Sequence, residues 1–126
     1  MNDAGAKRGD VYAIGKKNPN LPFHPAVRAG DFIFVSGQVP GEPGEIAHET
    51  RQVIENLKRI LEGCGASLAD VVKTLVFLAD GRDFAAMNAV YAEFFGEAKP
   101  ARSTVVAAFA IPNIKIEIEA IAYRPR

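Results

Sequence analysis

Two hydrophobic periodicities divide the chain into short strands and two amphipathic helices. Between residues 49 and 64, apolar side chains recur every three or four positions, which predicts a helix with one buried stripe. A second helix is expected over residues 83–95, just before Gly96. The two stripes comprise Val53, Leu57, Ile60, Leu61 and Cys64 in the first helix, and Phe84, Met87, Tyr91, Phe94 and Phe95 in the second.

Five further segments have the composition of strands: residues 10–14, 31–36, 71–78, 103–108 and 115–123. Residues 71–78 are apolar and β-branched throughout, which is typical of a central strand covered on both faces. A single helical turn is expected at residues 67–70. The predicted order is β-β-α-β-α-β-β, an α+β sandwich in which two helices cover one face of a mixed sheet.

The last strand alternates between two sets of side chains, with Ile116 and Ile118 on one face and Glu117 and Glu119 on the other. The strands hold more apolar residues than one helix-covered face requires, so we expect a second copy of the chain to cover the other face. With no repeat or long linker, residues 1–126 are expected to form a single domain, with a flexible N-terminus at residues 1–9.

The charge balance and the rare residue types exclude several classes of protein. Fifteen basic residues balance fifteen acidic ones, so neither nucleic acid nor a membrane is an expected partner. The single cysteine, Cys64, forms no intrachain disulfide and is expected to be a small buried hydrophobe. His24 and His48 lack metal-ligand spacing, so no metal site is predicted. With no apolar segment of signal-peptide or membrane-spanning length, we expect a cytoplasmic protein.

Arg102 and Glu117 are the candidate catalytic residues. A guanidinium offers a planar fork of donors that suits a carboxylate ligand, and a nearby carboxylate can hold a water molecule. Taken singly, each residue has a structural alternative: Arg102 as a surface or ion-paired arginine, and Glu117, like Glu119, as a charge that protects a strand edge. Gly37 follows a strand and suits either a bulge or the close approach of a ligand.

Several motifs together resemble the RidA (YjgF/YER057c/UK114) family over roughly residues 22–123. They occur in the same order and with approximately the same spacing as in that family. The matching segments are VSGQVP (35–40), NLK (56–58), VVKT (71–74), DF (83–84), MNAVY (87–91), FF (94–95), PARS (100–103) and EIEAIA (117–122).

The resemblance implies a chorismate-mutase-like fold assembled as a homotrimer, with ligand clefts between subunits and no cofactor. It implies hydrolysis of enamines or imines, such as 2-aminoacrylate and its imine tautomer, to 2-oxo acids and ammonia. Arg102 matches the arginine that binds the substrate carboxylate, and Glu117 matches the glutamate that positions water. The positions that match the lining of the cleft are Phe23, Ser36, Gly37, Asn88 and Thr104.

The chain departs from the family pattern at three places. Phe23 replaces a tyrosine and therefore lacks its hydroxyl, Thr104 replaces a frequent cysteine, and the segment at residues 41–49 is shorter than usual. Two other functions therefore stand beside a general imine deaminase. One is a binder or sensor of 2-oxo acids without turnover, and the other is a pathway-specific deaminase, for example of 2-aminomuconate or of an aminoacrylate.

Overall fold

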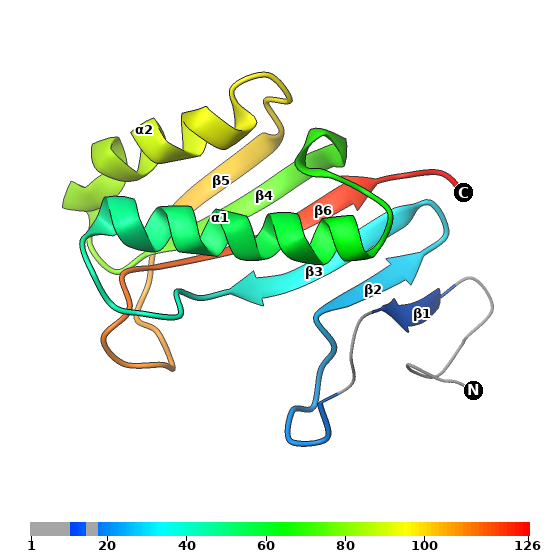
Figure 1. Cartoon of the computed structure of the whole chain (residues 1–126). Helices are drawn as coiled ribbons and strands as arrows, with labels where there is room; N and C mark the ends of the chain where they lie inside the picture. Colours follow the sequence, from blue (N-terminus) through cyan, green and yellow to red (C-terminus); the bar gives the residue numbers. More distant parts are fainter. Residues whose placement is uncertain (1–10, 15–17) are drawn as a thin grey trace.

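The computed structural model describes residues 11–14 and 18–126, which form one mixed sheet and two helices (Figure 1). The predicted flexible segment at residues 1–9 lies outside the described residues. The elements in chain order are β1 (Val11–Ile14), β2 (Ala26–Ala29), β3 (Phe32–Gln38), α1 (Ile46–Gly63), the 3-10 turn η1 (Leu68–Asp70), β4 (Val71–Leu78), the 3-10 turn η2 (Gly81–Asp83), α2 (Phe84–Phe95), β5 (Ala101–Val106) and β6 (Ile116–Tyr123).

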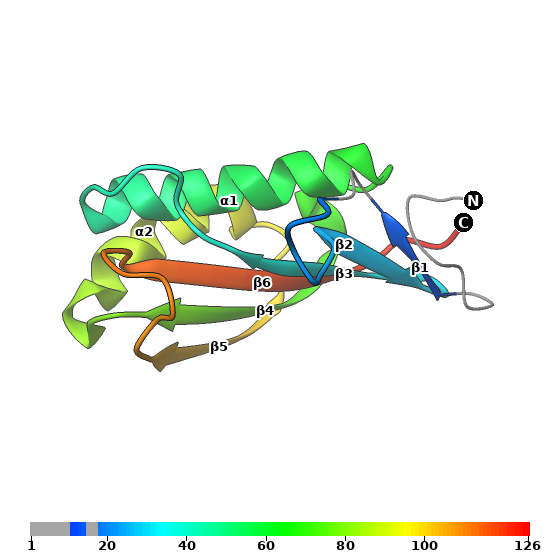
Figure 2. The same ribbon diagram turned by 90° about the horizontal axis from the view of Figure 1, so that it is seen from below.

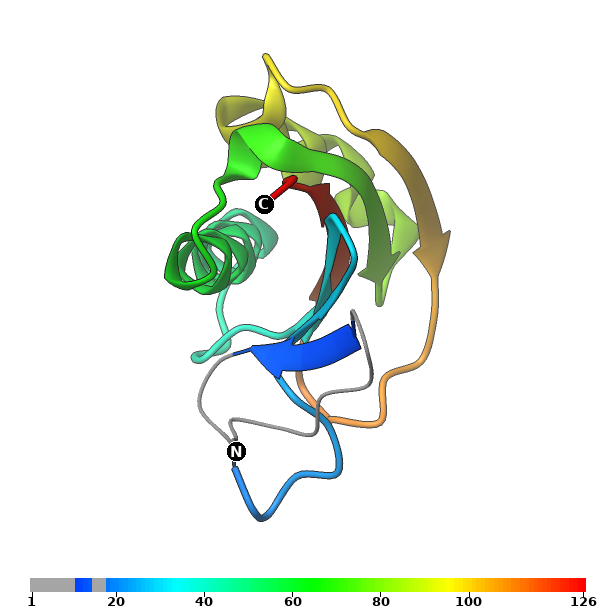
Figure 3. The ribbon, with the colours of Figure 1, turned by 90° about the vertical axis from the view of Figure 1, so that its right-hand side faces the viewer.

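The six strands lie in the order β1-β2-β3-β6-β4-β5. β4 and β5 are parallel, and every other neighbouring pair is antiparallel, so the sheet is mixed as expected. Both helices cover the same face, which is plain when the sheet is seen edge-on (Figure 2). An end-on view shows the sheet curving around α1 (Figure 3). The α+β class and the helix arrangement are therefore confirmed.

One strand was not predicted. β2 contains only Ala26, Val27, Arg28 and Ala29, a short run whose alanines and charge give little strand signal. The structure nevertheless pairs it with β1 and β3 and buries Arg28, whose guanidinium donates to the carbonyl oxygens of Gly30 and Arg124 at 3.1 and 2.9 Å. These two bonds satisfy the buried charge. The order is therefore β-β-β-α-β-α-β-β.

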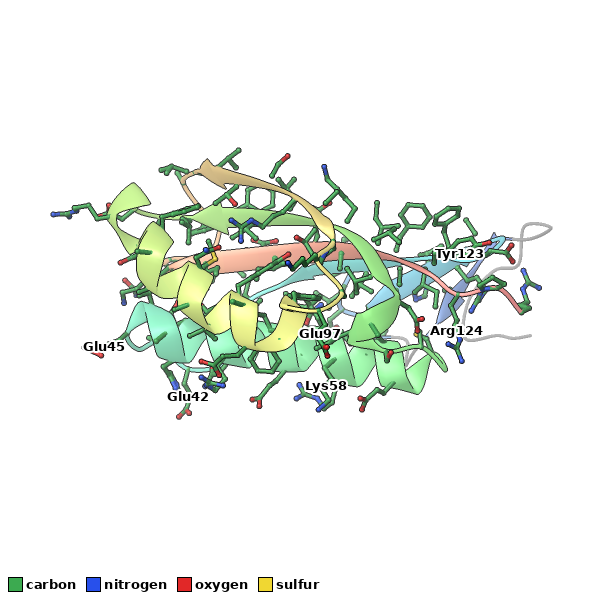
Figure 4. The ribbon with its side chains drawn as sticks, turned by 90° about the horizontal axis from the view of Figure 1, so that it is seen from above. Glu42, Glu45, Lys58, Glu97, Tyr123 and Arg124 are labelled. Carbon is green, nitrogen blue, oxygen red and sulfur yellow. The ribbon has the colours of Figure 1, made fainter. Side chains whose placement is uncertain are left out.

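The helix stripes are mostly as expected. Val53, Ile54, Leu57 and Leu61 of α1 are fully buried, and the helix begins at Ile46, three residues before the predicted start. The outer side of α1 is polar: Lys58 of this helix, and Glu42 and Glu45 in the segment before it, point away from the sheet in Figure 4. Phe84 of α2 was expected in the core but is 45% exposed, because it lies at the first turn of the helix.

A buried carboxylate ties the start of β6 to the segment before α1. Glu49 is completely buried, and its two oxygens accept hydrogen bonds from the backbone N–H groups of Gly44 at 3.0 Å and Lys115 at 2.8 Å. The ammonium of Lys115 lies 3.7 Å from the same carboxylate and donates to the carbonyl of Gly44 at 2.7 Å. The position of β6, and with it that of Glu117, is thereby fixed to α1.

The face without helices presents large apolar side chains to water in the single chain. In β3 and β6 they alternate with core residues, and Val105 of β5 lies beside Phe77 of β4, so the strand pattern places them there. Four are 41 to 46% exposed: Phe32, Phe34, Val105 and Tyr123. The rings of Phe32 and Tyr123 lie 5.2 Å apart across β3 and β6. A face with several exposed apolar side chains of this kind is typical of a protein interface.

Candidate active site

The seven residues singled out from the sequence form two groups in the structure. The arginine group comes from α2 and β5 and comprises Arg102, Asn88 and Thr104. The glutamate group comes from β3, β6 and the segment before β2 and comprises Phe23, Ser36, Gly37 and Glu117. Each group is a set of neighbours, but the two groups lie at different places in the chain's fold.

In the arginine group, the guanidinium of Arg102 rests on α2. Its Nη1 donates to Oδ1 of Asn88 at 2.7 Å, and its Cζ lies 4.7 Å from the centroid of the Tyr91 ring and 5.6 Å from that of Phe84. Phe84, Asn88 and Tyr91 are spaced i, i+4, i+7 and so share one side of the helix. Thr104, two positions along β5, shares the face of Arg102.

In the glutamate group, the carboxylate of Glu117 lies directly over Gly37. A β-carbon on Gly37 would stand 3.0 Å from Cδ of Glu117 and would collide with one of its oxygens. The register of β3 against β6 shifts between Val35 and Gln38, so Gly37 lies in a β-bulge, one of its two predicted roles. Burial raises the pKa of Glu117, and the neighbouring charge of Glu119 raises it further.

Phe23 and Gly37 line the same open hollow of about 590 Å³. Its other apolar walls are Pro19, Leu21, Pro25, Val39 and Ile60. The hydroxyl of Ser36 does not line this hollow; it donates to the carbonyl of His24 at 2.7 Å, and the Ser36 N–H donates to that of Pro25 at 2.9 Å. Ser36 therefore holds the segment that carries Phe23 against β3.

The two groups do not meet within one chain. Arg102 faces α2, on the helix-covered side of the sheet, whereas Glu117 alternates with the core residues Ile116 and Ile118 and faces the other side. β4 also lies between β5 and β6. The two residues lie on consecutive strands of the sequence but not on neighbouring strands of the sheet, because β6 inserts between β3 and β4.

Sequence reasoning missed the residues beneath Arg102. Tyr91 and Phe84 were assigned only to the helix core, although their spacing with Asn88 already placed all three on one side. The Tyr91 hydroxyl shares a 2.7 Å hydrogen bond with the hydroxyl of Thr74, which is fully buried. Burial raises the pKa of Tyr91, against the opposing effects of Thr74 and Arg102. The phenol therefore stays protonated at neutral pH.

The remaining candidates behave as ordinary structural groups. Cys64 is half-buried beside the core, and burial raises the pKa of its thiol. Within residues 11–14 and 18–126, no three His, Cys, Asp or Glu side chains are grouped so that they could hold a metal ion. The helices of this described part are also too short or too polar to cross a membrane.

Comparison with known proteins places the chain in a family. The family profile described as Endoribonuclease L-PSP matches residues 15–124. The chain belongs to the YjgF/YER057c/UK114 family. The crystal structure of a putative endoribonuclease from Thermotoga maritima has a TM-score of 0.84 with it at 41% identity, covering 96% of this chain and all of that one.

Two curated members of the family have enzymatic names. The 2-iminobutanoate/2-iminopropanoate deaminase of Escherichia coli is 45% identical over 112 residues, which are 82% of this chain and 88% of that protein. The 3-aminoacrylate deaminase RutC of Acinetobacter baylyi is 39% identical over 120 residues, which are 90% and 95% of the two chains. Both names describe removal of an amino or imino group from a small compound.

Proposed function

We propose that the protein is a hydrolytic deaminase of 2-imino acids and their enamine tautomers, of the 2-aminoacrylate/2-iminopropanoate type. The observation that carries this proposal is that Arg102 is held in place while most of its guanidinium donors are unused in the described part of the chain. Asn88 and the two aromatic rings fix its guanidinium, yet only Nη1 is used among the described residues, so the other donors remain for a carboxylate. The names of the E. coli and A. baylyi relatives support the same class of reaction.

The reaction requires a bound carboxylate, a positioned water and a group that moves a proton. Arg102 binds the substrate carboxylate and thereby fixes the imine carbon. Water attacks that carbon; the new C–O bond forms as the C=N π electrons move to nitrogen. Glu117 accepts the proton of the attacking water and returns it to the nitrogen. This addition gives a carbinolamine, whose hydroxyl proton passes to the amino nitrogen as the carbon–oxygen double bond forms; the C–N bond then breaks, which releases ammonia and leaves the 2-oxo acid.

We further propose that the complete site forms between two copies in a homotrimer, with the arginine group of one subunit beside the glutamate group of the next. Two observations support this assembly. The groups lie on opposite faces of the sheet within one chain, and the face of Glu117 carries the exposed apolar side chains Phe32, Phe34, Val105 and Tyr123. An interface there buries this apolar surface.

The test is ammonia release from 2-aminoacrylate generated freshly in the assay. The protein is expected to accelerate release over the buffer rate, and Arg102→Ala is expected to abolish that acceleration while the oligomer persists in light scattering. Arg82→Ala is the matched control, because Arg82 is an exposed arginine that pairs only with its neighbour Asp80 among described residues. An Arg102→Ala protein as active as wild type would contradict the assignment.

A second function, binding of 2-oxo acids without turnover, is favoured by Phe23. This side chain lines the hollow beside Gly37 but lacks the hydroxyl that a tyrosine would bring to a ligand. Calorimetry with 2-oxobutanoate and a panel of unstable imines separates the two functions. Tight binding of the oxo acid with no accelerated hydrolysis of any imine favours a binder. Hydrolysis restricted to one imine favours a pathway-specific deaminase.

A further inference from the structure

The guanidinium of Arg102 is held from below by a fixed ring. Tyr91 lies between Arg102 and the interior of the protein, with its ring 4.7 Å from Cζ of the arginine. The ring also packs against that of Phe95, with 4.7 Å between the centroids. A cation over an aromatic face is attracted to it, so the ring surface defines the plane in which the guanidinium rests.

The ring itself is fixed by a hydrogen bond in the core. Thr74 in β4 pairs in register with Arg102 in β5, and its fully buried hydroxyl is 2.7 Å from the Tyr91 hydroxyl. The backbone register therefore sets the distance from Thr74 to Arg102, and the hydrogen bond sets the position of the ring relative to Thr74. A tilt of the ring leaves buried hydroxyl groups without a partner, which is costly.

We propose that Tyr91, fixed by Thr74, is the positioning residue that orients the Arg102 guanidinium for the substrate carboxylate. The inference rests on the proposed function, since it assigns the orientation of the same carboxylate anchor. Asn88 fixes one nitrogen of the guanidinium, and one hydrogen bond leaves rotation about that contact open. The ring removes this freedom, so the free donors stay in the geometry that a bidentate carboxylate needs.

The experiment compares affinity for a carboxylate with affinity for its neutral amide. Titration of 2-oxobutanoate and 2-oxobutanamide into the intact oligomer gives a preference ratio that reports on how well the site binds the carboxylate group. Thr74→Val and Tyr91→Phe are expected to lower this ratio about tenfold and to raise KM more than they lower kcat. Thr74→Ser keeps the hydroxyl and is expected to retain the wild-type ratio.

The double variant Thr74→Val/Tyr91→Phe separates orientation from packing. It removes both hydroxyl groups, so no buried partner is left unpaired, and its thermal stability is expected to recover toward wild type. The preference ratio is expected to stay low, because the ring is no longer fixed. Full recovery of the ratio together with stability would overturn the positioning role.

The outcomes also separate this inference from the proposed function. A wild-type protein that prefers the carboxylate, with an unchanged preference in folded Thr74→Val and Tyr91→Phe, overturns the positioning role and leaves the deaminase proposal intact. A wild-type protein with no preference for the carboxylate, and no hydrolysis of the imines, overturns both. Circular dichroism of each variant establishes that it is folded before its ratio is read.

Discussion

The carboxylate of Glu117 in β6 occupies the space that a side chain at position 37 of β3 would fill. The backbone conformation at Gly37 does not itself require a glycine, because its φ angle is one that other residues also adopt. What requires a glycine here is therefore the neighbouring carboxylate. The bulge of β3 and the position of Glu117 thus form one arrangement.

Gly37→Ala tests this relationship directly. The added methyl group must displace the Glu117 carboxylate, so kcat/KM is expected to fall by about tenfold or more, with a loss of about 1 kcal/mol in unfolding free energy. Gly41→Ala is the matched control, since a β-carbon there meets nothing within 4 Å. Steady-state kinetics and urea unfolding measure the two effects. Equal activity of the two variants would contradict the relationship.

The acid limb of the pH–rate profile is expected to depend on Glu119. Glu117 must be ionised to accept a proton from water, so activity falls as pH falls through its raised pKa. Glu119→Gln removes the repulsion that helps to raise this pKa, and the acid limb of kcat/KM therefore moves to lower pH. Burial, the larger cause, remains, so the shift is partial. Glu62→Gln, on the exposed side of α1, is expected to leave the profile in place.

Because its pKa is raised in the folded protein, ionised Glu117 slightly destabilises the fold. Its folded pKa is raised above the unfolded value of about 4.3, so the folded state binds the proton more tightly and stability falls as pH rises between the two values. Glu117→Gln is expected to abolish activity yet stabilise the fold at pH 7. The gain in unfolding free energy is expected to be only about 0.5 kcal/mol, because the carboxylate is partly exposed and screened by solvent. The gain disappears below about pH 4. Urea unfolding at the two pH values measures it.

Mixing two inactive variants tests the site between subunits. Arg102→Ala keeps an intact glutamate group, and Glu117→Gln keeps an intact arginine group. After joint unfolding and refolding at equal amounts, random trimers are expected to regain about a quarter of the wild-type rate, because that share of the interfaces joins two intact groups. Each variant refolded alone is the control. A site within one chain regains nothing on mixing.

Glu49 is expected to be the most sensitive acidic residue for stability. Glu49→Ala leaves the buried N–H groups of Gly44 and Lys115 without their acceptor, with an expected loss of about 3 kcal/mol in unfolding free energy. Glu55→Ala, at an exposed position of the same helix, is expected to stay within about 0.5 kcal/mol of wild type. Urea unfolding followed by circular dichroism compares the two.

The sequence predicted the elements that have a strong period and missed those whose structure depends on distant partners. Residues 71–78 and both helices followed from side-chain patterns alone. β2 did not, because its pairing and the buried Arg28 depend on carbonyl groups that include one from Arg124, at the other end of the chain. The local sequence pattern cannot identify a hydrogen-bond partner so far away in the chain.

The candidate site residues could be selected one by one from the sequence, but their arrangement could not. Arg102, Gly37 and Glu117 were recognisable from a series of motifs, and the structure supplies contacts for each. Arg102 and Glu117 lie on opposite faces because of the side-chain alternation and register of β5 and β6, and β4 separates them because β6 inserts between β3 and β4; the strand order in the sequence reveals neither. The role of Thr74 was equally hidden, since it depends on a register between strands and on a helix side chain.

The hydrogen bonds of Gly44 and Lys115 to Glu49 also determine how the loop between β3 and α1 tolerates a change of length. The backbone leaves β3 after Gln38, and the carboxylate of Glu49 binds it again at Gly44 and also binds Lys115, directly before β6. An insertion or deletion between these two points falls in the loop around Gly41 and Glu42, which is joined to α1 by hydrogen bonds with Gln52 and Asn56. The length of this loop can therefore change while β6, which carries Glu117, keeps its place.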